Sequence, residues 1–243
     1  MSLTRIFVSL LIVAAAAAST PSAAQAQWYF NGYLGANHTQ TADVNISQPA
    51  SGTAFTYSQV TFESRPFEAP QYYGYRFGHI QDGGRLAFEF EFIHEKVYAQ
   101  VGQTFLVVGQ AGGGPVSGME RMDARVQEYA MSHGLNFILL NAVSRQPIGD
   151  NGSAFLLRGG IGPTLPHAES IVGGASREQY EWAGVGLQAS AGVDLHMTGR
   201  LSGLVEYKLT YAHPTISIVN GTGDMRAVSH HIAAGLGVRL TSR

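Results

Sequence analysis

The sequence predicts an all-β protein, an antiparallel up-and-down eight-stranded transmembrane β-barrel, from three observations. Residues 182–197 (WAGVGLQASAGVDLHM) alternate apolar residues with mostly small or polar ones, and two is the side-chain period of a β-strand. The stretch exceeds the about 5–6 residues usual for strands and covers the roughly 9–11 residues that a tilted transmembrane strand needs. Only 13% of the 243 residues are Asp, Glu, Lys or Arg, against about 25% in an ordinary soluble domain. Part of the surface is therefore expected to face lipid.

The N-terminus has the features of a secretory signal. Arg5 supplies a positive charge, residues 6–18 form an apolar core, and Ala24-Gln25-Ala26 fits a small-x-small cleavage site. The core is shorter than the about 20 apolar residues of a membrane-spanning helix. We therefore expect residues 1–26 to be a cleaved signal peptide and residues 27–243 to be the barrel domain.

Eight alternating segments follow along the chain, and the lengths of their connections give the orientation. The segments are residues 28–38, 71–79, 85–96, 126–144, 154–165, 180–197, 201–212 and 227–240. The long connections are residues 39–70, 97–125, 166–179 and 213–226, and the connections after the second, fourth and sixth segments are short. Outer-membrane barrels have short periplasmic turns and long outer loops. This alternation places both termini in the periplasm and four long loops outside the cell.

Two of these long connections contain strand-like stretches. Residues 54–62 of the first are expected either to form a hairpin beyond the membrane or to add a strand pair. Residues 104–108 of the second are apolar, and we favour an extension of a neighbouring barrel strand over a separate contact patch. The first two loops are nevertheless the predicted site of partner contact.

Charged side chains are expected to fill the interior. The predicted lumen set is Arg76, Glu89, Glu91, Glu128, Arg158, Asp194, Glu206, Lys208 and Arg239. Acids and bases are nearly balanced, and buried charges need partners. Eight strands leave an interior just wide enough for side chains, so a structural salt-bridge plug is favoured over a selectivity lining or a proton path. Such a barrel conducts poorly or not at all.

The opening WYFNGYLGAN, the aromatic alternating segments and the closing IAAGLGVRL resemble the small eight-stranded outer-membrane barrels, the group that includes OmpA, OmpX and OmpW. The resemblance covers residues 27–243. It implies a monomer in the outer membrane that contacts lipid and lipopolysaccharide and is inserted by the barrel-assembly machinery. Such barrels usually end on an aromatic residue, whereas this chain ends Leu240-Thr241-Ser242-Arg243. The competing fold, a lipocalin-like soluble barrel, requires a charged exterior.

Two functions are compatible with this fold. The first is a structural or surface-interaction barrel, or a narrow porin-like passage for small solutes. The alternative is an outer-membrane hydrolase acting on lipid A or phospholipid, for which Ser132-His133, residues 167–170 and residues 229–231 supply serines and histidines. Adjacent strand residues point to opposite faces, so Ser132 and His133 are not expected to pair, whereas Ser229 and His231 share a face. No motif for lipid A deacylation is present.

Composition predicts no other ligand. The formal net charge of -2 shows no basic excess for nucleic acid. The chain has no cysteine, and its nine histidines show no metal-ligand spacing. The sequence therefore predicts neither a metal nor a cofactor.

Overall fold

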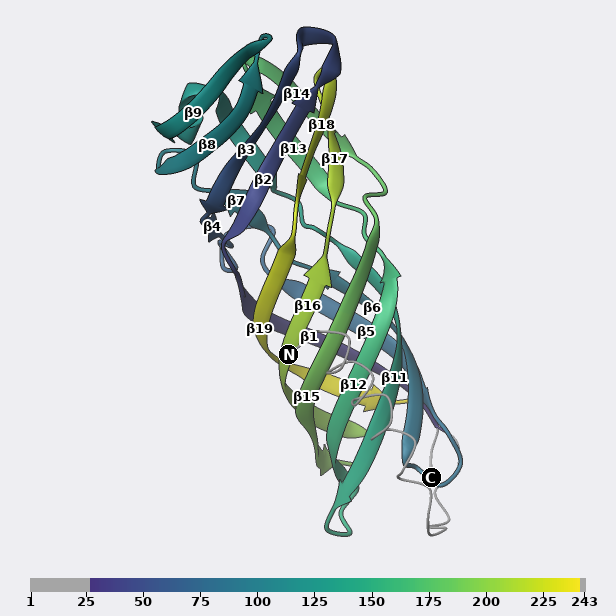
Figure 1. Cartoon of the computed structure of the whole chain (residues 1–243). Helices are drawn as coiled ribbons and strands as arrows, with labels where there is room; N and C mark the ends of the chain where they lie inside the picture. Colours follow the sequence, from purple (N-terminus) through teal and green to yellow (C-terminus); the bar gives the residue numbers. More distant parts are fainter. Residues whose placement is uncertain (1–26, 241–243) are drawn as a thin grey trace, which may run out of the picture.

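The computed structural model describes residues 27–240, so the predicted signal segment lies outside the described residues. In this part of the chain, eight antiparallel strands close into a barrel and two further sheets form a head above it (Figure 1). This confirms the predicted fold class. No helix among the described residues is long and apolar enough to cross a membrane.

The barrel strands agree closely with the predicted segments. In order around the barrel they are β1 (Gln27–Thr39), β19 (Ala227–Arg239), β16 (Leu201–Ala212), β15 (Val185–Thr198), β12 (Ser153–Pro163), β11 (Phe137–Ile148), β6 (Leu86–His94) and β5 (Tyr73–Ile80). β1 closes the barrel by pairing with both β19 and β5, so that Tyr33 lies opposite Gly235 on one side and Gly74 on the other. The first and last barrel strands are thus neighbours.

Apolar side chains face outward and charged ones inward. On β6, Phe88 and Phe90 are 52% and 46% exposed, whereas Glu89 and Glu91 between them are buried. The same alternation leaves aromatic and aliphatic residues exposed on the other barrel strands. An exterior of this kind matches the lipid-facing band of transmembrane barrels rather than the charged surface of a soluble one.

The predicted segment 126–144 is wrong as a single strand. The structure divides it into β10 (Val126–Met131), which belongs to the head, and β11, which belongs to the barrel. Gly134, at φ +95°, lies in the connection between them, in a conformation that favours glycine. On β11, Phe137 and Leu139 are buried inside the molecule, whereas Leu140 faces outward.

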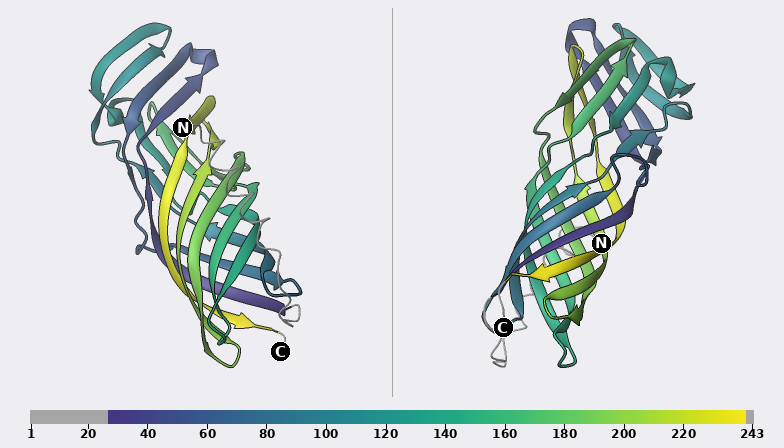
Figure 2. Two further views of the ribbon diagram at one scale, coloured as in Figure 1. Left: turned by 60° about the horizontal axis from the view of Figure 1, so that its bottom comes forward. Right: turned by 180° about the vertical axis from the view of Figure 1, so that it is seen from behind.

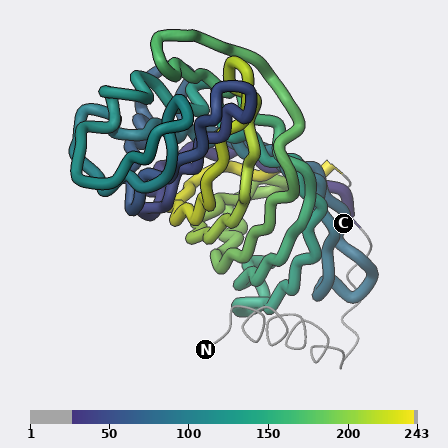
Figure 3. The backbone as a smooth tube through the Cα atoms, turned by 45° about the horizontal axis from the view of Figure 1, so that its top comes forward, coloured from purple at the N-terminus to yellow at the C-terminus, as the bar shows by residue number. Residues whose placement is uncertain are grey.

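The head is built from all four long connections, which are therefore not open loops (Figures 2 and 3). One sheet has the order β14 (Ala175–Tyr180), β13 (His167–Val172), β10, β7 (Val97–Ala99) and β4 (Phe62–Glu63). The other has the order β17 (Thr215–Ile218), β18 (Gly221–Met225), β2 (Ala42–Gln48), β3 (Thr53–Val60), β8 (Thr104–Ala111) and β9 (Gly114–Arg121). Two short 3-10 helices, Pro49–Ser51 and Met122–Ala124, lie in the connections.

Both strand-like stretches of the long connections belong to this head. Residues 54–62 include most of β3, which forms a hairpin with β2 rather than an added barrel strand pair. Residues 104–108 begin β8, which pairs with β3 and β9. The expectation that they extend a barrel strand is therefore wrong. Phe105 and Val107 point into the head core, and Leu106 and Val108 face solvent.

Two apolar clusters lie above and below the middle of the barrel. The upper cluster runs from the head core, with Val44 and Tyr57, into the barrel mouth at Phe137 and Leu139. The lower cluster is formed by Tyr29, Ile80, Ala87, Val143, Ala154, Leu156 and Leu204. The polar interior lies between these two clusters.

Candidate functional site

Six charged side chains form an ion-pair network in the middle of the barrel. Arg76 Nη2 lies 2.7 Å from Glu91 Oε1 and 2.5 Å from Glu206 Oε1. Arg158 contacts Glu206 and lies 2.5 Å from Glu89. All of these side chains are at most 1% exposed.

Lys208 completes the network and makes it electrically neutral. Its ammonium contacts Glu91 and lies 3.4 Å from Glu206 Oε1. Three bases thus face three acids, and every charge has at least one opposite partner. Six of the nine predicted lumen residues belong to this network.

Uncharged side chains satisfy further acceptors of the network. Tyr29 donates to Glu89 at 2.5 Å and Tyr33 donates to Glu91 at 2.6 Å. Asn141 and Gln188 donate to Glu91 Oε2 at 2.7 and 2.5 Å. The sequence did not identify the two tyrosines as members of the network, because a tyrosine that faces the lumen has the same period of two as a tyrosine at the lipid interface.

The other three predicted lumen residues lie elsewhere. Asp194 and Arg239 lie near the lower barrel end, where Arg145 Nη2 is 3.0 Å from Asp194 Oδ2 and Arg239 Nη2 is 3.9 Å from it. Glu128 is not in the lumen, because it lies on β10 of the head. Burial, together with the nearby charge of Glu169, raises the pKa of Glu128. Its misplacement follows directly from the break between β10 and β11.

Ser229 and His231 share a face of β19, as predicted, but they converge on an acid rather than on each other. Ser229 Oγ donates to Glu95 Oε1 at 3.1 Å, and His231 Nε2 lies 3.1 Å from Glu95 Oε2. All three residues are buried. The two side chains therefore do not form a serine–histidine pair.

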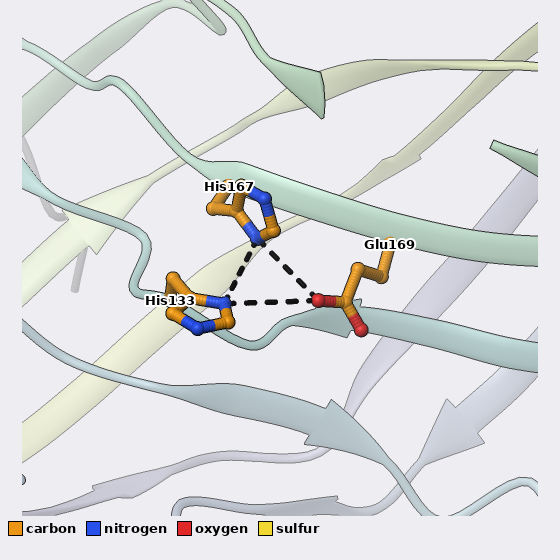
Figure 4. Close-up of side chains that lie close together, drawn as sticks. All are labelled: His133, His167 and Glu169. Carbon is orange, nitrogen blue, oxygen red and sulfur yellow. Dashed lines mark hydrogen bonds and ion pairs between the residues drawn. The ribbon is translucent and has the colours of Figure 1, made fainter. Parts of the chain in front are cut away.

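A second polar cluster, formed by Ser132, His133, His167 and Glu169, lies at the end of β10 and the start of β13, two strands of the head. Figure 4 shows the last three side chains pointing toward one another. His133 Nδ1 is 3.2 Å from His167 Nδ1, and Glu169 Oε1 is 3.7 Å from the first of these nitrogens and 3.4 Å from the second. Three potential metal ligands therefore meet at one point.

Ser132 lies against the same three atoms. Its hydroxyl donates to Glu169 Oε1, and its Oγ is 3.1 Å from both His133 Nδ1 and His167 Nδ1. The expectation that Ser132 and His133 cannot pair is wrong because β10 ends at Met131. Beyond the strand end, the alternation of faces no longer applies.

The ring of His167 also has contacts on the side away from this cluster. Its Nε2 lies 3.1 Å from Glu178 Oε1 on β14, and its ring centroid is 4.4 Å from that of Tyr180. The side chain of His133 is 52% exposed, against 9% for His167 and 23% for Glu169. The cluster is thus anchored on one side and open to solvent on the other. The sequence offers Ser132-His133 and residues 167–170 as separate candidates but does not bring them together, because His133 and His167 are 34 residues apart.

The comparisons with known proteins add little to this geometry. No protein-family model matches the chain, and no curated protein is significantly similar to it. Among solved structures, Neisserial surface protein A is 14% identical, with 88% of this chain and 99% of that chain covered and a TM-score of 0.38. The outer membrane protease OmpT from Escherichia coli is 8% identical, with 91% and 99% covered and a TM-score of 0.46. At these identities and TM-scores, the similarities carry no argument about function.

Proposed function

We propose that this chain is an outer-membrane barrel that does not conduct and that carries a folded β-head at the cell surface. Its role is structural or in surface interaction, with lipid and lipopolysaccharide around the barrel wall and the head as the contact surface. One observation carries the proposal, namely the neutral, fully buried network of Arg76, Arg158, Lys208 and their three glutamates.

The network supports a closed lumen because its members bind one another instead of water. A selectivity lining requires charged groups that remain hydrated and available to a passing solute. Here the side chains of Arg76, Glu91 and Lys208 are 0% exposed. The apolar residues Phe137 and Leu139 above the network add a second barrier. This arrangement speaks against the narrow porin-like passage.

The exterior supports placement in the membrane. Exposed apolar side chains occur on each of the eight barrel strands, whereas the charges of the barrel middle are buried inside. A large exposed apolar belt is stable only against lipid or another apolar surface. The short turns at one end and the head at the other support an orientation with the head outside the cell.

Planar-bilayer recording tests the closed lumen. We expect the purified full chain, inserted into a lipid bilayer, to give no large stable openings, because the network leaves no hydrated path. A matched control is a general porin inserted under the same conditions. Steady single-channel steps from the wild-type chain would contradict the proposal.

A serine hydrolase in the same barrel is the second candidate, favoured by one observation. Ser132 Oγ lies 3.1 Å from His167 Nδ1, whose other nitrogen lies 3.1 Å from Glu178 Oε1. A nucleophile, a base and an orienting acid occur in this order in serine hydrolases. Against this reading, Ser132 also donates to the Glu169 carboxylate, which competes with the histidine for the hydroxyl proton.

Lipid analysis distinguishes the two candidates. If Ser132 is a nucleophile, cells that express the wild-type chain should contain deacylated lipid A or lysophospholipid that is missing from cells that express Ser132→Ala. We expect identical lipid mass spectra from the two strains. A wild-type-specific product would favour the hydrolase.

A further inference from the structure

We propose that His133, His167 and Glu169 bind one divalent transition-metal ion of the zinc class at the junction of barrel and head. The ion would connect the β10–β11 segment, which carries His133, to β13, which carries the other two ligands. It therefore links the connection between the head strand β10 and the barrel strand β11 to the third long connection of the chain. This inference does not depend on whether the barrel conducts.

The distances between the three atoms fit a metal centre. The sides of the triangle formed by His133 Nδ1, His167 Nδ1 and Glu169 Oε1 are 3.2, 3.4 and 3.7 Å. The point equidistant from the three atoms therefore lies about 2.0 Å from each of them. This distance matches zinc–nitrogen and zinc–oxygen bonds of about 2.0–2.2 Å. An ion at the centre of the cluster would therefore be within bonding distance of all three.

The tautomer of His167 is also compatible with a bound cation. His167 Nε2 lies against the Glu178 carboxylate, an acceptor, so this nitrogen is the protonated one in a neutral ring. Its Nδ1 is then a lone pair that faces a second imidazole nitrogen and the Glu169 carboxylate. The Ser132 hydroxyl donates to Glu169 Oε1, and its Oγ also lies 3.1 Å from His167 Nδ1. A cation at the centre of the cluster would accept lone pairs from His167 Nδ1 and Glu169 Oε1, and from His133 Nδ1 in the tautomer whose proton is on Nε2.

Glu178 also has the position of an outer partner of a metal ligand. Histidines that bind metals almost always donate their second ring N–H to a carboxylate, a carbonyl or water. The 3.1 Å contact between His167 Nε2 and Glu178 Oε1 provides this interaction.

The donor set favours zinc or a related ion. Imidazole and carboxylate ligands suit zinc, copper, iron and nickel, whereas calcium and magnesium prefer oxygen ligands alone. Three protein ligands leave a fourth position for the Ser132 hydroxyl or water, which is the coordination of an open zinc site. The exposed side chain of His133 gives the ion access from solvent.

Isothermal titration of the full chain with Zn²⁺ tests the site. The protein is purified in detergent without a polyhistidine tag, treated with EDTA and titrated with ZnCl₂. We expect one ion per chain for wild type and at least a 100-fold weaker affinity for His133→Ala and His167→Ala. Glu178→Ala should weaken binding about 10–100-fold, because it removes only the orienting partner. Co²⁺, added in place of Zn²⁺, should give a visible absorption band that the ligand variants lack.

His213→Ala is the matched control. His213 is also an exposed histidine of the head region with a carboxylate partner, since its Nε2 lies 2.9 Å from Asp224 Oδ1. This variant should bind Zn²⁺ like wild type. Equal affinities for wild type and folded His133→Ala, or an equal loss in His213→Ala, would overturn the proposal. Folding is checked by circular dichroism, and the 52% exposure of the His133 side chain makes its replacement the safest of the three.

Discussion

At the residue scale, Glu206 is the centre of the ion-pair network. Its carboxylate contacts Arg158 and lies 2.5 Å from Arg76 and 3.4 Å from Lys208. Removing one member of a buried pair leaves the partner charges without compensation, which costs more than the pair itself contributes. The network is therefore sensitive to the loss of one charge.

Glu206→Gln should lower the free energy of unfolding by about 3–5 kcal/mol, the usual cost of breaking a buried ion pair. Urea unfolding in lipid vesicles, followed by tryptophan fluorescence, measures this change. Glu63→Gln is the control, because the Glu63–Arg65 pair lies on the surface of the head, and its loss should cost less than ~1 kcal/mol. Equal destabilisation by the two variants would contradict the role of the network.

Gly74 shows why some inward positions carry no side chain. A Cβ at this position would lie 2.1 Å from the ring of Tyr33, which packs across the glycine and donates to Glu91. The ring also lies 4.2 Å from the ammonium of Lys208. The small residue and the tyrosine together place the hydroxyl within the network.

Gly74→Ala should destabilise the barrel by about 1–3 kcal/mol, because the ring of Tyr33 must move and overpacking a core has this cost. The same urea titration measures it. Gly32→Ala, where the nearest atom to the new Cβ is 4.0 Å away, should unfold at nearly the wild-type urea concentration. If Gly32→Ala proves the more harmful substitution, the packing of Tyr33 is not the cause.

At the element scale, the head depends on strand pairs that join distant parts of the chain. β2 follows the first barrel strand, β18 precedes the last one, and the two pair with Thr222 opposite Ser47. Residues directly opposite in an antiparallel pair have Cα atoms about 4.5–5.5 Å apart, within the range that a disulfide bridges. The chain has no cysteine of its own, so any intramolecular disulfide in a double-cysteine variant must join the two introduced residues.

Ser47→Cys combined with Thr222→Cys should oxidise to an intramolecular disulfide, seen as a mobility shift on non-reducing gels. Ser47→Cys combined with Ser217→Cys is the control. Ser217 lies opposite Thr222 on the far side of β18, so its distance from Ser47 is about two strand spacings, or ~9.5 Å. A disulfide in the control pair but not in the test pair would show that the head sheet has a different order.

The alternation of apolar and polar residues along a strand determines which parts of this fold can be predicted from the sequence. The barrel strands have a strict period of two and long apolar faces, so their bounds come out within a few residues, apart from β11 and the start of β15. The predicted segment 180–197 begins at Tyr180, which ends the head strand β14, whereas β15 begins at Val185. Two head strands, β4 and β7, have only two and three residues, too few to show a period. They are held by strands from other parts of the chain, which one stretch of sequence does not reveal. The meeting of His133, His167 and Glu169 is hidden for the same reason, because it joins the β10–β11 segment to β13.

At the scale of the whole molecule, three buried layers fill the barrel. The upper apolar cluster, the ion-pair network and the lower apolar cluster follow one another along its axis. Each of the six charges in the network has an opposite partner, which is what the proposed closed lumen requires. The residues that face solvent above the barrel belong to the head, which makes the head the expected surface for recognition.

The pairing of β18 with β2 lies directly above the seam between β19 and β1, where the two ends of the barrel sheet meet. A lipid that entered the barrel sideways through this seam would have to separate the head strands at the same time. Because β2 directly follows the first barrel strand and β18 directly precedes the last one, the two ends of the barrel sheet are joined a second time in the head, above the seam.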